Sequence, residues 1–542
     1  MVPELTARMA RASNPRGTTA MWVRDHLGGL WNDRDFVSWY PRDGRPGLSP
    51  AQLASVCVLQ FLLNLSDRQV AEAVRCRIDF KYALALELDD PGFHHSVLSD
   101  FRERLGEDER ADRLLSLALE RMRKAGLVTE RGRQRTDSTQ VLAAARDLTR
   151  LEMVLEAVRA ALEEAARDVP EILDGLVDAD WATRYGRPVR LPSQPTHPVT
   201  RLKQAGADAH RLLECLPSHR RGPRMEALRQ ILVQNFLIDA RGLLRPRTEK
   251  DGQPKGARRI VSPYDCETRR AIRGNTRWSG YLVHVTETCD PGGNANLITD
   301  IATTSPTRDT QALPGIHTRL RQRRLLPRQH LVDGGYLSVA LLESSAVHHQ
   351  IQLIGPVKAN GAWQKKEQTG FTRDDFTIDF DHRHVICPNG QTAKTWITPP
   401  AMAPYTVARF HPQQCNPCPD RSACTRGTSA RTVNFLPRHL HELQIRNRTD
   451  QQDLQWRQLY ATRSGVEGTI CEFVNGHQAR RSRYHGLRKT HVQHVLTGIA
   501  INLERLASRT PPRCQGPRHP TVFQRYLDSR GLTWECWWRQ GK

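Results

Sequence analysis

Lysine is scarce in this chain of 542 residues, because only 11 of its 80 basic residues are lysine and the other 69 are arginine. Long apolar runs are also missing from the sequence, whereas a membrane-spanning helix needs about 18 or more apolar residues in a row. The segment MVPELTARMARASNPRG at the N-terminus has no apolar signal core. We therefore expect a cytoplasmic protein with no membrane partner.

Acidic residues are too few to balance the arginines, since 58 Asp and Glu face 80 Lys and Arg and leave a net charge of +22. GC-rich coding is one explanation of the preference for arginine over lysine, but it does not explain the excess of positive charge. A large basic chain is typical of a protein with a polyanionic partner, most simply a nucleic acid. The length predicts two to four domains.

Disulfides are not expected, although the chain has 12 cysteines, because cytosolic thiols stay reduced. Cysteines that stand alone are expected to be small core residues: Cys57, Cys76, Cys215, Cys266 and Cys289. Four others cluster among prolines and glycines: Cys387, Cys415, Cys418 and Cys424. Four thiolates are enough for a closed, structural zinc site. The alternatives are four unligated thiols, or a site in which one cysteine is replaced by a histidine: His382, His384 or His411.

Helical patterns dominate residues 47–125. Ser66 and Gln69 have the spacing of a capping box that opens a helix, and a further short helix is predicted from Ser96. Two short helices around a compact turn are typical of a helix-turn-helix, and equally of an ordinary helical bundle.

A strand is predicted over residues 131–145, with Asp137 near its middle in RTDST, and a long helix follows it. From residue 278 the apolar residues no longer follow helical spacing, and the pattern becomes typical of strands. WSGYLVHVTETCD and ANLITDIATT predict two strands joined around DPGG. RQHLVDGGYLSVALLESS predicts a strand, a turn at Asp333 and a helix, and IQLIGPVK predicts another strand. This order indicates an α/β fold with a mixed sheet.

Three acidic residues are candidates for binding divalent metal ions: Asp137, Asp333 and Glu467. Magnesium prefers carboxylate oxygens, and two such ions about 4 Å apart promote phosphodiester chemistry. Each residue also has a simpler interpretation. Asp137 is suited to a side-chain-to-backbone turn, Asp333 to the turn before two glycines, and Glu467 to a surface salt bridge.

The predicted helix around Glu467 strengthens the metal interpretation. Tyr460, Arg463 and Glu467 are spaced to share one helix face. Gly465 and Gly468 flank the acid, although each glycine costs about 1 kcal/mol inside a helix. These glycines are expected to let another backbone, such as a DNA strand, approach closely.

Three motifs occur in order along the chain: RTDST, HLVDGGY and the arrangement of Tyr460, Arg463 and Glu467. Together with the stretch SRYHGLRKTHVQHVLTGIAINLERL that follows them, they resemble the DDE transposases of bacterial insertion sequences. The block from WYPRDGRPGLSPAQLASVCVLQFLLNLSDRQVAEAV to SDFRERL resembles the InsH-type N-terminal domain. The resemblance covers roughly residues 30–507. It implies that Asp137, Asp333 and Glu467 are the catalytic, metal-binding acids.

The resemblance also implies residues that contact DNA. Tyr460 and Arg463 match the residues that accompany the glutamate. A lysine often follows that glutamate by seven residues, but Val474 stands there in this chain. Candidates for its place are Arg480, Arg481 and Lys489.

The implied fold is a ribonuclease H-like core with a helical N-terminal domain, a helical insertion and a cysteine-bearing insertion. The expected segments are an N-terminal segment (1–46), a helical DNA-binding domain (47–125), three parts of the core (131–145, 260–359 and 446–507), a helical insertion (146–250), a zinc-binding insertion (360–445) and a basic, poorly ordered tail (508–542).

The function implied is that of a transposase which binds the terminal inverted repeats of its element, cuts the DNA with a metal-activated water and joins the freed 3′ hydroxyl to target DNA. Its cofactors would be two magnesium or manganese ions and a structural zinc ion. Its partner would be double-stranded DNA, bound by at least a homodimer, which implies association with the nucleoid. The alternatives are a metal-dependent nuclease that never joins strands, and a non-catalytic DNA-binding protein derived from a dead element.

Overall fold

The computed structural model describes residues 1–40, 47–192, 194–215, 222–252, 254, 259–292, 295–306, 308–357, 363–509 and 521–532. The chain divides into two compact units. One unit comprises Met1–Phe101 and Ile499–Lys542, and the other comprises Arg102–Gly498.

The first unit is helical. Its N-terminal part contains α1 (Glu4–Ser13), α2 (Thr19–Leu27), the 3-10 helix η1 (Asp33–Trp39), α3 (Pro50–Leu62), α4 (Asp67–Cys76), α5 (Ile78–Leu84) and the start of α6 (Ser96–Leu105). α3 is the most apolar, and it buries Leu53, Val56 and Phe61. The capping box predicted at Ser66 and Gln69 is confirmed at the start of α4.

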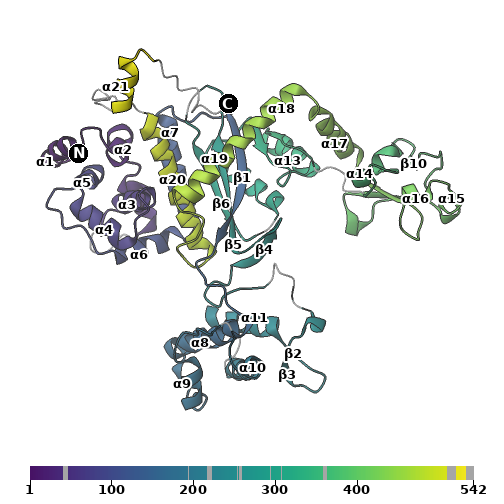
Figure 1. Cartoon of the computed structure of the whole chain (residues 1–542), viewed down its shortest axis with the longest axis horizontal. Helices are drawn as coiled ribbons and strands as arrows, with labels where there is room; N and C mark the ends of the chain where they lie inside the picture. The colour runs from purple at the N-terminus through teal and green to yellow at the C-terminus, as the bar shows by residue number, and fades with distance from the viewer. Residues whose placement is uncertain are drawn as a thin grey trace. The chain divides into compact units, whose positions relative to one another are not determined.

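A six-stranded mixed sheet lies in the second unit (Figure 1). Its strands are β1 (Arg133–Leu142), β4 (Arg269–Arg273), β5 (Thr276–Thr288), β6 (Ile298–Thr304), β7 (Gln329–Val332) and β8 (Gln352–Ile354). The order is β4-β5-β1-β7-β8, and β6 also pairs with β5. β1 runs antiparallel to β5 and parallel to β7, and β7 runs parallel to β8. This mixed α/β arrangement is consistent with a ribonuclease H-like core.

Helices pack on this sheet at several places. α12 (Leu313–Gln322) contacts β6, α13 (Val339–His349) contacts β8, and α19 (Gly465–Cys471) contacts β1 and β5. α7 (Arg110–Lys124) precedes β1 in the chain. The predicted hairpin around DPGG is confirmed, because β5 and β6 pair antiparallel.

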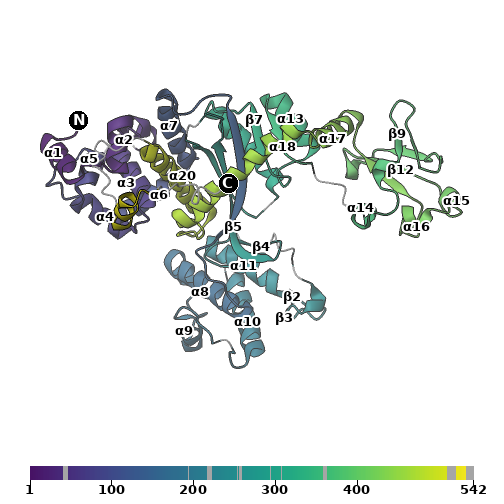
Figure 2. The ribbon, with the colours of Figure 1, turned by 45° about the horizontal axis from the view of Figure 1, so that its top comes forward.

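Four helices follow β1 in the chain: α8 (Arg150–Asp168), α9 (Ala179–Tyr185), α10 (Pro198–Glu214) and α11 (Pro223–Asn235). α8, α10 and α11 lie side by side (Figure 2). They bury a common core that includes Leu155, Val158 and Leu228. The short hairpin of β2 (Phe236–Ile238) and β3 (Leu244–Pro246) follows them.

The cysteine-bearing stretch is built from short elements. They are α14 (Trp363–Glu367), β9 (Thr377–Asp379), β10 (His384–Ile386), β11 (Thr395–Ile397), β12 (Thr406–Arg409), α15 (Pro412–Cys415), α16 (Arg421–Cys424) and β13 (Thr432–Phe435). β9 pairs with β10, and β11, β12 and β13 form a three-stranded sheet. Phe376, Val385, Phe410 and Phe435 form its own small core. α17 (Arg438–Asp450) follows it.

The C-terminal region contains more structure than expected. α20 (Leu487–Arg509) is followed by residues 510–520, which lie outside the described part of the chain. The expectation of a poorly ordered tail is wrong for Val522–Ser529, which form the helix α21 with a capping box at Thr521 and Gln524. Among the helices described, none has the length and apolar character needed to cross a membrane.

Candidate active site

Asp137 and Asp333 are brought together by the parallel pairing of β1 and β7. Thr136 of β1 pairs with Val332, the last residue of β7. Asp137 follows Thr136 and Asp333 follows Val332, so the two acids occupy neighbouring positions at the same end of the pair. Their closeness has an electrostatic effect, since the charge of Asp333 raises the pKa of Asp137.

Asp137 lies in a largely buried position, with 15% of its side chain exposed. Burial raises the pKa of its carboxyl above the ordinary value, and the nearby Asp333 adds to this shift. The backbone N–H of Ser138, which donates to Oδ1 of Asp137 at 2.7 Å, and the Arg463 guanidinium act in the opposite direction. A carboxyl in this environment is stabilised in its charged form by a cation.

Asp333 is oriented by the turn that follows β7. The backbone N–H of Gly335 donates to its Oδ1 at 2.6 Å, and the N–H of Tyr336 donates to its carbonyl oxygen at 3.1 Å. The turn interpretation of this residue is therefore correct as far as the backbone is concerned, and the same turn fixes the carboxylate beside Asp137.

Glu467 is carried by a helical run of three consecutive pieces: α18 (Leu454–Ala461), the 3-10 turn η9 (Thr462–Ser464) and α19. Arg463 lies in the middle piece. Its Nη1 donates to Oδ2 of Asp137 at 3.2 Å, and its Nη2 donates to Oε1 of Glu467 at 2.8 Å. One guanidinium therefore connects two of the three acids. Glu467 itself is 61% exposed.

The three carboxylates do not yet meet as ligands of one ion. Within the described residues, their oxygen atoms are not all within 4.8 Å of one another. The structure thus places Asp137 beside Asp333 and links Glu467 to Asp137 through Arg463.

Tyr460 lies in the same neighbourhood. Its ring stacks on Trp456 at a centroid separation of 5.0 Å and packs against the buried cluster of Cys289, Leu331 and Ile354. Burial raises the pKa of its hydroxyl, and the charges of Asp333 and Asp137 contribute to the same shift.

A buried ion pair anchors this helical run to the sheet. Arg135 on β1 donates from Nε to Oε1 of Glu287 on β5 at 2.7 Å and from Nη1 to the carbonyl oxygen of Thr462 at 2.6 Å. Thr469 on α19 donates to Oε2 of Glu287 at 2.6 Å. These bonds fix the run on both sides of Arg463 and therefore orient Arg463 and Glu467.

The two glycines beside Glu467 differ in the space around them. A Cβ on Gly465 would lie 2.1 Å from Nη1 of Arg135, so this glycine makes room for the anchoring arginine. The expectation that Gly465 admits a DNA strand is therefore wrong. A Cβ on Gly468 would meet nothing within 4 Å, so the surface beside Gly468 is open.

A fourth acid and a second arginine lie next to these residues, and neither is among the candidates named from the sequence. Asp309 begins the 3-10 turn η6 (Asp309–Gln311). Its Oδ2 and Oδ1 of Asp333 both lie 2.8 Å from the point that a Cβ on Gly335 would occupy. Oγ of Ser138 donates to Oδ1 of Asp309 at 3.2 Å, and Arg273 approaches Asp309 at 3.6 Å. The only available signal was an acid placed shortly after the second strand of a hairpin.

The remaining candidates for DNA contact differ in how strongly other parts of the protein bind them. Arg480 donates from Nη1 to Thr139 Oγ1 at 2.9 Å and to the carbonyl oxygen of Gln140 at 2.8 Å, so it holds the chain to β1. Arg481 is exposed, and Lys489 pairs with Glu103 at 2.6 Å. Val474, at the position of the missing lysine, is buried.

The clustered cysteines lie near one another in their small domain. Cys387, Cys415 and Cys424 pack against its core. Nδ2 of Asn389 donates to Cys418 at 3.2 Å, and the N–H of Gln391 donates to Cys387 at 3.3 Å. Burial raises the pKa of Cys424, and the other three thiols add to the shift. In the described part of the chain no three of these sulfur atoms lie within 4.8 Å of one another, so a shared zinc ion would require them to draw closer.

The histidine alternatives have other partners. Nδ1 of His382 lies 2.8 Å from Asp379, which also lies 3.8 Å from His384. His411 caps α15, where its Nδ1 accepts from the N–H of Gln413 at 3.3 Å.

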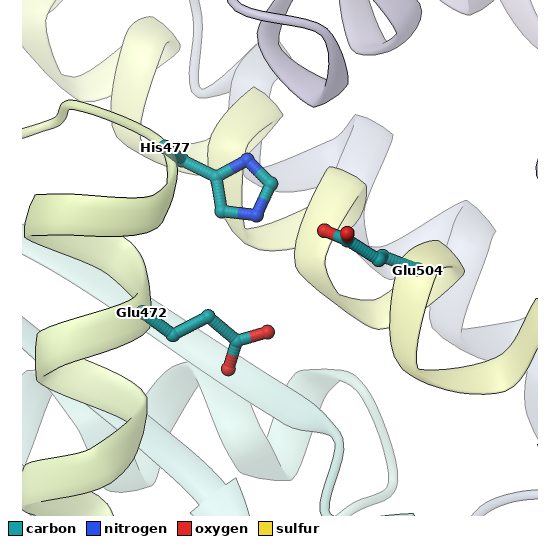
Figure 3. A group of neighbouring side chains, drawn as sticks. All are labelled: Glu472, His477 and Glu504. Carbon is teal, nitrogen blue, oxygen red and sulfur yellow. The ribbon is translucent and has the colours of Figure 1, made fainter. Parts of the chain in front are cut away.

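Beyond Glu467, α19 continues into the π-helical segment η10 (Glu472–Gly476). Figure 3 shows the side chains of Glu472, the first residue of this segment, and of His477, the residue that follows its last. Glu504, also labelled there, belongs to the first unit. π-Helical segments recur at functional sites, and this one directly follows α19, the helix that carries Glu467.

Family models match two parts of the chain. Residues 386–507 match a transposase DDE domain, and residues 15–104 match a transposase domain (DUF772). Both matches are to transposase families, and together they support an insertion-sequence DDE transposase. They do not confirm the InsH-type subtype. The matched DDE segment of this transposase contains Glu467 and the four clustered cysteines, whereas Asp137 and Asp333 lie upstream of it. No curated protein and no solved structure matches the chain.

Proposed function

We propose that this transposase binds the terminal inverted repeats of its own element, cleaves the DNA there and joins the freed 3′ ends to target DNA. The observation that carries the proposal is that Asp137 and Asp333 directly follow the paired residues Thr136 and Val332 of β1 and β7, with Arg463 connecting Asp137 to Glu467. Carboxylates that two neighbouring strands and an adjacent helix bring into one neighbourhood suit phosphodiester chemistry with divalent metal ions.

The donor set fits magnesium or manganese. Asp137, Asp333 and Glu467 offer only oxygen atoms, which these hard cations prefer. Asp137 is buried beside another acid, so a bound cation would offset the repulsion between them. When bound, two such ions activate the attacking hydroxyl and stabilise the leaving oxygen of the phosphodiester.

The chain's own groups would align the DNA. Arg463 is suited to a phosphate oxygen, because its planar fork binds phosphate in two places. Tyr460, beside it, offers a ring edge and a hydroxyl to the strand. Arg481 and Lys489 lie further along the chain and would add sequence-independent affinity that falls steeply with salt. Arg480 would act mainly by holding its loop to β1.

The four cysteines are proposed to hold a structural zinc ion. Cys387, Cys415, Cys418 and Cys424 come from separate turns of one small domain, and two of them already accept hydrogen bonds from neighbouring amides. Zinc would then stabilise a domain that has only a small apolar core of its own.

We also propose for each segment the role that the resemblance implies. Residues 47–125 would read the terminal repeats, residues 146–250 and 360–445 would be insertions in the core, and the active complex would contain at least two copies that pair two DNA ends. The protein would act in the nucleoid.

The experiment that tests this function uses the full chain with DNA carrying the ends of its element. The wild type should cleave the ends in the presence of Mg²⁺ or Mn²⁺ and join pre-cut ends to a target plasmid. Asp333→Asn should abolish both steps and leave DNA binding intact. Cleavage without joining would indicate a nuclease, and binding without either step would indicate a non-catalytic DNA-binding protein. Cleavage by Asp333→Asn would show that the catalytic assignment is wrong.

A further inference from the structure

The hairpin of β4 and β5 is strongly basic. The stretch RRAIRGNTR, residues 269–277, contains four arginines and no acid. Arg273 pairs with Thr276 across a two-residue turn in which Gly274 has φ of 57°. Arg270, Arg273 and Arg277 are exposed. A basic, exposed hairpin is suited to the phosphate backbone of a nucleic acid.

Arg273 points from this hairpin toward the acids. Its Nη1 donates to Oγ of Ser138 at 3.1 Å, and Ser138 is the residue whose N–H donates to Asp137. Its Nη2 lies 3.6 Å from Oδ2 of Asp309. With 44% of its side chain exposed and five N–H donors on its guanidinium, Arg273 keeps donors for a further acceptor.

Asp309 connects Arg273 to the other catalytic aspartate. Its Oδ2 lies near Gly335, on the same side as Oδ1 of Asp333. Its Oδ1 accepts from Ser138. Burial raises the pKa of Asp309, whereas Arg273 lowers it. Asp309 therefore has two roles available to it, that of a support for Arg273 and that of another metal ligand.

We propose that Arg273 binds the phosphate that neighbours the scissile one, and that Asp309 is the positioning residue that holds Arg273 there. The proposal rests on the proposed function, because it assumes that the scissile phosphate lies at Asp137, Asp333 and Glu467. Arg463 and Arg273 then supply positive charge to the strand from two different elements, a helical turn and a hairpin.

The geometry favours a support role for Asp309 over a metal role. Oδ1 of Asp309 accepts from Ser138 and its Oδ2 lies beside Arg273, so both of its oxygens already have protein partners. A held arginine loses less freedom when it binds phosphate, which aligns the strand for reaction.

The test compares Arg273→Ala with Arg241→Ala in the full chain. Arg241 is an exposed arginine in the turn between β2 and β3, so its replacement removes the same charge elsewhere. Arg273→Ala should lower the cleavage rate at saturating DNA by about 10- to 100-fold, because the strand is misplaced. It should also reduce the slope of log K against log salt by about 0.9, the value for one phosphate contact. Arg273→Lys should keep that slope but not the rate.

A second measurement identifies the phosphate. Methylphosphonate linkages, which carry no charge, replace the phosphates around the cleavage site one at a time. In the wild type, neutralising the phosphate next to the scissile one should slow cleavage. In Arg273→Ala the same linkage should cause no further loss, whereas in Arg241→Ala it should cause the full loss.

The outcomes separate this inference from the proposed function. If the wild type cleaves and Arg273→Ala behaves like Arg241→Ala, the inference fails and the proposed function stands. If the wild type does not cleave, both fail. Asp309→Asn should slow cleavage less than Arg273→Ala and leave Mn²⁺ affinity without DNA unchanged. Weaker Mn²⁺ binding by Asp309→Asn would make Asp309 a metal ligand and overturn its assignment as a support.

Discussion

Arg463 contacts Asp137 and Glu467 with separate nitrogens of a single guanidinium, at 3.2 and 2.8 Å. The single positive charge of Arg463 is thus shared between two of the carboxylates that are proposed to bind metal. A divalent ion that binds them has to share their oxygens with Arg463 or displace it. The displaced guanidinium would be free to bind a DNA phosphate.

Removing this charge should tighten metal binding. In the full chain without DNA, Arg463→Met should bind Mn²⁺ about tenfold more tightly, the equivalent of about 1.4 kcal/mol of charge interaction. Electron paramagnetic resonance of free Mn²⁺ measures the affinity. Arg457→Met, an exposed arginine on α18, is the matched control and should not change it. Equal or weaker Mn²⁺ binding by Arg463→Met would contradict the competition.

The two glycines around Glu467 should respond in opposite ways to alanine. Gly465→Ala places a methyl group against Arg135, whose guanidinium is held by Glu287 and Thr462 and cannot yield freely. Overpacking of this kind costs about 1–3 kcal/mol of unfolding free energy and should also slow cleavage.

Gly468→Ala is the matched control for that change. The added methyl group would meet nothing within 4 Å, so the higher helix propensity of alanine should stabilise the protein by up to about 1 kcal/mol. Thermal unfolding of both variants provides the comparison. Equal effects of the two substitutions would show that Arg135 does not set the position of α19.

Local features of the fold were readable from the sequence, because their determinants lie within a few residues. The capping box at Ser66 and the hairpin around DPGG depend only on neighbouring positions, and both are present. The strand–turn–helix order around Asp333 was also correct, since β7 ends at Val332 and α13 begins at Val339.

Contacts between distant segments could not be read in the same way. Ser138 and Asp309 are 171 residues apart, and Arg273 and Ser138 are 135 residues apart. No local pattern indicates that these side chains meet, because the meeting depends on which strands pair. Gly465 was misinterpreted for the same reason, since its partner Arg135 lies on a strand far upstream.

Chelation should test the cysteine cluster. The purified protein should contain about one zinc ion per chain, and a strong chelator should remove it and lower the thermal stability of residues 363–445. Cys415→Ser should lose the zinc, because a closed site needs all four ligands. Cys215→Ser should retain it, because Cys215 lies outside the cluster; Cys215 and Cys76 are exposed, so the expectation that they are core residues is wrong. Elemental analysis that finds no zinc in the wild type would contradict the site.

Acid should destabilise the protein through its buried histidines. Burial lowers the pKa of His494 to about 3, that of His330 to about 3 and that of His284 to about 4. These rings are neutral when folded, whereas in the unfolded chain they gain protons near pH 6.5. Stability should therefore be greatest above that pH and fall as the pH drops from about 6.5 toward 4, by up to about 1.4 kcal/mol per pH unit for each histidine.

His494→Gln should be less stable than the wild type at pH 7.5, because its bond to Thr303 is changed, and the difference should shrink at pH 5. Replacing the exposed His485 by Gln should leave the pH dependence unchanged. Melting temperatures that differ by the same amount at both pH values would show that His494 does not carry this effect.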